Sequence, residues 1–290
     1  MNKLKSLLIL SVIITVLSAC GNADETDTSN SEVASTDEVW EEVQEAGEIV
    51  VGTAGTLFPA SFYDGEEGNQ NHLTGYDVEV AREIGDRLDL EVNFEIMNFD
   101  AMLSAVDTGR VDVILAGPRE GSEDSFGFSE PVKYSYSTMV VRSDDHSGIE
   151  TLEDLEGKDA GGAATTVYSD IARKFNAEVV TYGNAPNEAY LRDVHNGRTD
   201  LVINDYYLQR LGISEFPDLD IELHPDLKFH PTTNNVVMDK EADVFMENVN
   251  EAINDMKEDG TLSELSGEFF HGDDVSQEPE EDIIEIEGIE

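Results

Sequence analysis

The chain has 290 residues, of which 39% are hydrophobic, so it can bury a core in one large or two ordinary domains. It carries 64 acidic against 17 basic residues, a formal charge of −47, which argues against nucleic acid as a partner. Because salt screens repulsion among carboxylates, this excess indicates a halophilic protein. An ordinary acidic extracellular protein and a calcium-binding surface are the alternatives, but the sequence has no Asp-rich calcium loop.

The N-terminal residues have the pattern of a secretory signal. Lys3 and Lys5 precede an uncharged run, residues 6–19, that is too short to span a bilayer. The run ends in Leu-Ser-Ala-Cys, a match to the bacterial lipobox, in which cleavage before the cysteine is followed by acylation of its thiol. We therefore predict a lipoprotein signal peptide at 1–20 and lipid attachment at Cys20, with the protein on the extracellular side of the cell membrane. A plain signal peptide with a cysteine there by chance is the alternative.

Both ends of the chain beyond this signal are acidic and poor in apolar residues. We predict a solvated tether and lead-in at 21–44 and a disordered tail at 272–290. Cys20 is the only cysteine, so the protein has no internal disulfide, and its stability must come from the core.

Between these ends, strand-like apolar runs alternate with helical patterns, which predicts an α/β fold. In chain order the sequence predicts the following elements: a strand at 48–53, a helix at 76–88, a strand at 91–96, a helix at 101–108, a buried strand at 111–116, an extended run at 140–145, a helix at 168–174, a strand at 201–203, a helix at 206–211 and an extended run at 229–238.

Residues 103–115 repeat at the same spacing in residues 191–203. Each copy has a helical pattern, then a Gly-Arg pair with an aspartate two residues after the arginine, and then a buried strand. The repeat indicates two lobes built alike, with a chance similarity of two helix–strand corners as the alternative. We place lobe 1 at 45–141 plus 233–271 and lobe 2 at 142–232. Two crossings between lobes would form a two-strand hinge.

Six short segments between Ile49 and Phe270 carry a resemblance when they are taken together. They are 73–81, 109–112, 128–131, 152–158, 197–200 and 259–262. In this order they resemble the family 3 extracellular solute-binding proteins, the amino-acid-binding subunits of ABC transporters. Residues 52–59, 163–168 and 204–208 are similar to a Gram-positive branch linked to cystine and other sulfur-containing amino acids. The resemblance implies a two-lobed type II periplasmic-binding-protein-like fold, each lobe a mostly parallel sheet flanked by helices.

A free amino acid carries an ammonium and a carboxylate, so its site needs an acid, a base and directed N–H groups. Asp205 follows a buried strand, where open α/β sheets bind ligands, and the resemblance assigns it to the ligand ammonium. A helix N-cap is the alternative role. Asn204, beside it, is a further candidate.

The ligand carboxylate is expected at the start of the helix at 168–174. Ala164, Thr165 and Thr166 precede that helix, where free N–H groups favour an anion. Thr166 has a plain capping role as its alternative. The family's arginine is missing at its usual position, which Ser122 occupies. Arg119 is the only base between Asp112 and Pro131 and is nominated by its chemistry, with a surface pair to Glu120 or Glu123 as the alternative.

Aromatic residues and one glycine complete the predicted site. Phe58 or Phe62 follows the first strand and Phe99 the second, at positions whose family counterparts line the ligand, and Gly117 would offer its carbonyl or N–H. An aromatic side chain is more often core than pocket. The histidines are scattered, so we expect no metal site, and no cofactor motif is present.

These observations predict binding without catalysis. The expected partners are a small amino-acid ligand, ABC permease subunits and, through the lipid, the membrane, with the protein itself a monomer. A dehydratase-like enzyme on the same fold and a ligand-sensing module are the alternatives.

The charge excess makes a prediction about salt. We expect the melting temperature to fall as salt drops from molar to tens of millimolar concentration, because unscreened carboxylates repel one another. Thermal unfolding across that range checks this, and an unchanged melting temperature would remove the argument for salt adaptation.

Overall fold

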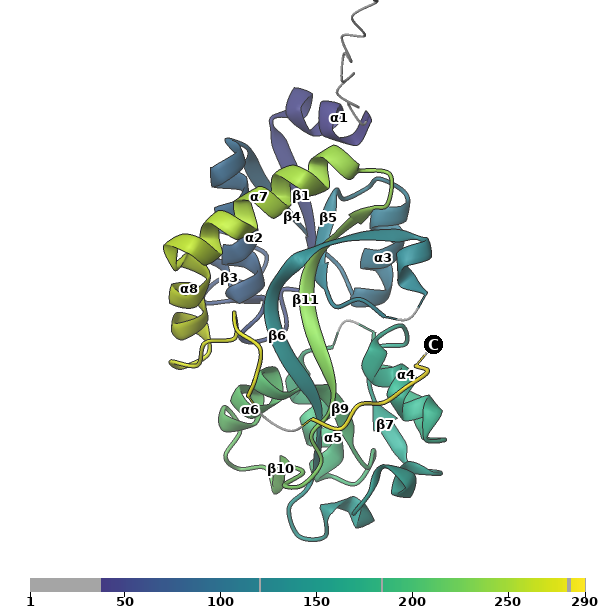
Figure 1. Cartoon of the computed structure of the whole chain (residues 1–290). Coiled ribbons are helices and arrows are strands. Elements are labelled where there is room, and N and C mark those ends of the chain that lie inside the picture. Colours follow the sequence, from purple (N-terminus) through teal and green to yellow (C-terminus); the bar gives the residue numbers. More distant parts are fainter. Residues whose placement is uncertain (1–37, 120, 184, 281–282, 290) are drawn as a thin grey trace, which may run out of the picture. The chain divides into compact units, whose positions relative to one another are not determined.

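The computed structural model describes residues 38–119, 121–183, 185–280 and 283–289, so the predicted signal peptide, Cys20 and most of the tether lie outside the described residues. Helices and strands alternate along the chain (Figure 1). The helices are α1 (Glu38–Ala46), α2 (Tyr76–Leu88), α3 (Phe99–Asp107), α4 (Val167–Lys174), α5 (Asn187–His195), α6 (Tyr206–Ser214), α7 (Asp243–Asp259) and α8 (Thr261–Phe269). The strands are β1 (Glu48–Thr53), β2 (Phe62–Tyr63), β3 (Leu73–Thr74), β4 (Glu91–Ile96), β5 (Val113–Ala116), β6 (Phe126–Arg142), β7 (Asp159–Gly161), β8 (Glu178–Val180), β9 (Val202–Asp205), β10 (Ile221–Leu223) and β11 (Phe229–Asp239).

The predicted α/β architecture is confirmed, with helices flanking a central sheet. The main sheet has the order β10-β6-β11-β5-β1-β4, and β9 also pairs with β6. β1 runs parallel to β4 and β5, whereas β11 runs antiparallel to β5 and β6. The sheet therefore contains both parallel and antiparallel pairs, because β6 and β11, its two longest strands, run antiparallel to the strands beside them. Within the described part of the chain, no helix is long and apolar enough to cross a membrane.

The first group of elements consists of α1, α2, α3, α7, α8, β1, β4 and β5. Alternation along β1 sends Ile49 and Val51 to a core with α2 and α7, whereas Val50 packs on the opposite side with α3. Tyr76 and Phe245 are fully buried in the core beside α2 and α7. Helices thus cover both faces of this part of the sheet.

The second group consists of α4, α5 and β7 to β10. Here Met139 and Val141 of β6 pack with Ile171 of α4, whereas Val140, facing the other way, packs with Leu191 of α5. α6 follows β9, but its Leu208 and Leu211 join the core of the first group. That helix therefore ties the two groups together by packing.

β6 and β11 belong to both groups and lie side by side (Figure 1). Residues 126–133 of β6 pair with 234–239 of β11 next to the first group. Residues 137–142 of β6 pair instead with β9 and β10. The chain thus passes between the groups at about residues 134–136, earlier than the predicted lobe boundary at 141. The lobe boundaries stay a prediction.

The internal repeat corresponds to two corners with the same construction. One is α3 followed by β5, and the other is α5 followed by β9, each turned by a left-handed glycine, Gly109 with φ 66° and Gly197 with φ 67°. In the first corner Asp112 accepts a hydrogen bond from the Val50 N–H at 2.7 Å. In the second, Asp200 accepts one from the Asp159 N–H at 3.1 Å. Each aspartate fastens its own corner to a neighbouring strand.

The C-terminal segment differs from the disordered tail expected at 272–290. Val275 and Ile289 are buried, and Ile284 forms an isolated parallel bridge with Phe229 of β11. The prediction rested on the acidic composition of the segment. The segment also contains a few apolar residues, and each of them contacts a core or a strand formed by the rest of the chain.

Candidate functional site

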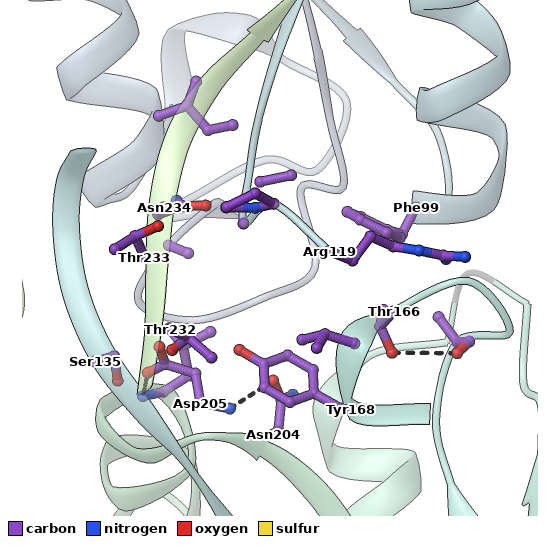
Figure 2. Close-up of a pocket in the computed structure, with 18 of the residues that line it drawn as sticks. Phe99, Arg119, Ser135, Thr166, Tyr168, Asn204, Asp205, Thr232, Thr233 and Asn234 are labelled. Carbon is purple, nitrogen blue, oxygen red and sulfur yellow. Dashed lines mark hydrogen bonds between the residues drawn. The ribbon is translucent and has the colours of Figure 1, made fainter. Parts of the chain in front are cut away.

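A cavity of about 1080 Å³ is lined by both groups of elements. The first group contributes residues that follow β1, β4 and β5, the second contributes residues around β9 and α4, and β6 and β11 form the wall between them. The predicted site residues that line it are Phe99, Gly117, Arg119, Thr165, Thr166, Asn204 and Asp205. Figure 2 shows Phe99 and Arg119 on one side of the cavity, across from Thr166 and Tyr168.

Asp205 lies at the end of β9 and is buried. One carboxylate oxygen accepts from the Leu208 N–H at 3.0 Å and so caps α6, while the other forms an ion pair with Lys133 of β6. Asp205 therefore caps α6, as the alternative role predicts, and also lines the cavity, while its binding of a ligand ammonium stays a prediction. The Asn204 side-chain oxygen accepts from the Asp205 N–H at 2.8 Å and fixes the turn from β9 into α6.

Lys133 is a buried base that the sequence analysis did not single out. Its ammonium contacts Asp205 and lies 5.8 Å from the centre of the Phe270 ring. Taking a charged pair out of water is costly, so such a pair persists only when both partners are present. The sequence offers little signal for this role, because β6 also carries Glu130, Arg142 and several hydroxyl side chains.

Asp77, at the start of α2, is a second carboxylate in the same wall. It accepts from the Asn234 side-chain amide at 3.0 Å. Burial raises the pKa of the Asp77 carboxyl to about 7; Lys133 opposes the rise and Asp205 adds to it. Asp77, Asp205 and Lys133 thus bring two carboxyl groups and an ammonium to one part of the cavity wall, and the Asp77 carboxyl titrates near neutral pH.

Arg119 reaches from the loop after β5 to the second group. Its guanidinium donates to the Thr165 carbonyl at 2.5 Å and lies 3.6 Å from the Asp170 carboxylate. Asp100 at the start of α3 makes a parallel contact, accepting from the Thr165 hydroxyl at 2.7 Å and from its N–H at 3.1 Å. Arg119 therefore lies between the groups, and Thr165 and Asp170, its partners described above, both belong to the second group.

The start of α4 is the predicted anion site. Thr166 is the N-cap of this helix, with its hydroxyl accepting from the Ser169 N–H at 3.2 Å, as the alternative for this residue proposed. Thr166 also lines the cavity, so the free end of α4 faces it. Ala164 does not line the cavity; its carbonyl accepts from Arg173 at 2.7 Å.

The predictions for the aromatic residues have different outcomes. Phe99 lines the cavity, but Phe58 and Phe62 do not. They pack edge to face with ring centres 4.9 Å apart, and Phe58 contacts the first group's core. Gly117 lines the cavity at a place where a Cβ atom would lie only 2.6 Å from the Thr233 carbonyl oxygen, so the loop can approach β11 only with glycine.

Tyr168 is another cavity residue that the sequence analysis did not nominate. It is the second residue of α4, and burial raises the pKa of its hydroxyl well above the ordinary value, with the charge of Asp205 adding to the rise. Figure 2 places its ring between Thr166 and the Asn204–Asp205 end of the cavity. Its apolar body and neutral hydroxyl suit contact with an uncharged part of a ligand.

The arrangement suits a zwitterion better than a reaction centre. Asp77 and Asp205 lie at one part of the wall, and Arg119 with the N-terminal end of α4 at another, so both charges of an amino acid would find opposite partners. Among the residues described, no three His, Cys, Asp or Glu side chains come together as a metal site would require.

Comparison with known proteins gives consistent matches over most of the chain. Residues 49–272 match the family described as bacterial extracellular solute-binding proteins, family 3. The chain is 47% identical over 274 residues to YckB of Bacillus subtilis (strain 168), named a probable ABC transporter extracellular-binding protein, covering 94% of this chain and 93% of that one. It is 30% identical over 280 residues to the L-cystine-binding protein TcyA of the same organism, covering 94% and 99%.

A crystal structure of Bacillus subtilis YckB shares the fold. It matches with a TM-score of 0.67 and 49% identity, covering 86% of this chain and 99% of that one.

The raised pKa of Asp77 predicts that the stability of the folded protein depends on pH. Its folded pKa of about 7 lies above the ordinary value of 3.8, so the folded protein binds the extra proton. The stability that this proton gives is present below pH 4 and is lost as the pH rises through 7. Asp77→Asn keeps an oxygen for Asn234 and removes the ionisation. We expect the variant to be more stable than the parent at pH 8 by roughly 1–3 kcal/mol, with little difference at pH 4.

Denaturant unfolding at several pH values measures this difference. Asp86→Asn, an exposed position on the same helix, is the matched control. A difference between the Asp77 variant and the parent that stays constant from pH 4 to pH 8 would contradict the assignment.

Proposed function

The chain belongs to the bacterial extracellular solute-binding proteins of family 3, and from this membership we propose that it is the substrate-binding subunit of an ABC importer for an amino acid or a close derivative. The observation that carries the proposal is one cavity lined by both groups of elements, with opposite charges in different parts of its wall. The protein binds its ligand without altering it chemically and delivers it to a permease. Its relatives in sequence are named as binding proteins.

The ligand ammonium binds at Asp205 and Asp77, and the ligand carboxylate at Arg119 and the start of α4. Lys133 already pairs with Asp205, and an ammonium from the ligand would give Asp77 an opposite charge as well. Ligand contacts drawn from both groups favour a closed arrangement over an open one, because only the closed arrangement makes all of them. In this proposal the two groups act as lobes hinged at β6 and β11.

We further propose that the ligand is L-cystine or another sulfur-containing amino acid. The support is the similarity over nearly the whole chain to a protein named for L-cystine binding, together with a cavity at the upper end of the size range of small-molecule sites. A two-headed amino acid occupies such a space better than a single small one.

The proposal places the protein on the extracellular side of the membrane, as a monomer held by a lipid at Cys20. We expect Cys20→Ser to release the protein from the membrane fraction into the medium, because it removes the only thiol available for acylation. Fractionation with immunodetection measures this, and a Ser variant that stays with the membranes as the parent does would contradict the lipid anchor.

The two ligand charges give a second prediction. Asp205→Asn keeps an oxygen for the α6 cap but removes the carboxylate, and we expect L-cystine binding to weaken by about 2–5 kcal/mol. Arg119→Ala should weaken it similarly, because it removes the partner of the ligand carboxylate. Calorimetric titration measures both effects.

The buried lysine requires a control. Asp205→Asn leaves Lys133 without its ionic partner, so the double variant with Lys133→Gln separates loss of binding from loss of stability. Native affinity in the Asp205 variants would contradict the ammonium site. A loss below about 1 kcal/mol for Arg119→Ala would place the carboxylate elsewhere.

A further inference from the structure

The C-terminal segment 275–289 lies beyond the part of the chain that matches the family, which ends at residue 272. It contacts both groups of elements and the cavity. Figure 1 shows its described parts in yellow, one following α8 and the other running from the lower parts of β6 and β11 towards α4.

Its first attachment is to the first group. Val275 is 1% exposed and belongs to the core beside α2 and α7. The Val275 N–H donates to the buried Ser266 hydroxyl at 2.6 Å, and its carbonyl accepts from the Tyr134 N–H of β6 at 2.7 Å. The segment is thus fixed at the place where β6 passes between the groups.

Its second attachment is to the second group. Ile284 accepts from the His230 N–H at 2.6 Å and donates to the Lys228 carbonyl at 3.1 Å, in the manner of a short strand beside β11. Further on, the Gly288 carbonyl accepts from Lys174 of α4 at 2.8 Å, and Ile289, 4% exposed, packs into that group's core.

Between the two attachments, the segment forms part of the cavity wall. Glu278, Pro279, Ile283 and Glu285 all line the cavity. Both glutamates are exposed, so their charges are open to solvent at the cavity. This part of the wall combines apolar contact with negative charge.

We propose that residues 275–280 and 283–289 act together as a strap, the first part attached to the first group and the second part to the second group, and that Glu278 and Glu285 on it select ligands with a second cationic group. This inference rests on the proposed function for the identity of the ligand. The strap is a third connection between the groups, next to β6 and β11. A ligand such as L-cystine binds with one ammonium at the buried carboxylates and the other against the strap.

Selectivity is tested with two probes that differ in one group. The mixed disulfide of L-cysteine with cysteamine ends in an ammonium, and that with propanethiol ends in a methyl group. We expect the parent protein to prefer the first. The full-length variant Glu278→Gln with Glu285→Gln should lose about three- to tenfold of this preference at low salt, because two exposed charge contacts are removed.

Glu287→Gln is the matched control, since Glu287 is exposed on the same segment and does not line the cavity. It should leave the preference unchanged. An unchanged preference in the double variant, or an equal loss in the Glu287 control, would overturn the assignment of Glu278 and Glu285.

Attachment is tested without ligand by amide hydrogen exchange. Ile289→Asp places a charge in a core and should free the end of the strap, so that the His230 amide exchanges at least tenfold faster while the Tyr134 amide keeps its rate. Equal exchange at His230 in variant and parent would overturn the strap. If the parent binds neither probe, the proposed ligand class fails, and the exchange result still decides whether the strap exists.

Discussion

The antiparallel pairing of β6 and β11 is the constraint on which the rest of the structure depends. One end of this pair lies beside β5 in the first group, and the other end carries β9 and β10 in the second. Its register shifts around Pro231 and Asn235, where the chain passes between the groups. Bulges bend a strand and increase its twist, so the irregular pairing sets the angle at which the two groups face each other.

The same register also brings the cavity charges together. Lys133 and Asn234 are partners across the pair, and each reaches a carboxylate from a different group: Lys133 contacts Asp205 after β9, and Asn234 donates to Asp77 on α2. A slip of either strand by one residue would turn the side chains of that strand to the opposite face and separate Lys133 from Asn234. The charge cluster and the connection between the groups therefore depend on a single alignment of two strands.

Regular elements with a clear apolar period could be predicted from the sequence, whereas features that depend on distant partners could not. The bounds of β1, α2 and β4 agree with prediction, because each has one strong pattern and a polar stop.

Asp205 could be placed at a strand end, but its pairing with Lys133 depends on which strand lies beside β9. Phe58 and Phe62 have the sequence spacing expected of cavity residues, yet spacing alone does not show whether an aromatic side chain packs in a core or lines a cavity. The ordered contacts of the C-terminal segment likewise depend on surfaces distant in sequence.

The position of the only cysteine has a chemical consequence for the cavity. Cys20 precedes the folded elements, so residues 38–289, which supply every residue of the cavity wall, contain no thiol. Exchange of a disulfide begins with attack by a thiolate, and the wall offers none. A disulfide-bearing solute held there would keep its sulfur–sulfur bond and leave in the oxidation state in which it entered. Its retention would then depend on shape and charge, without exchange with a thiol of the cavity wall.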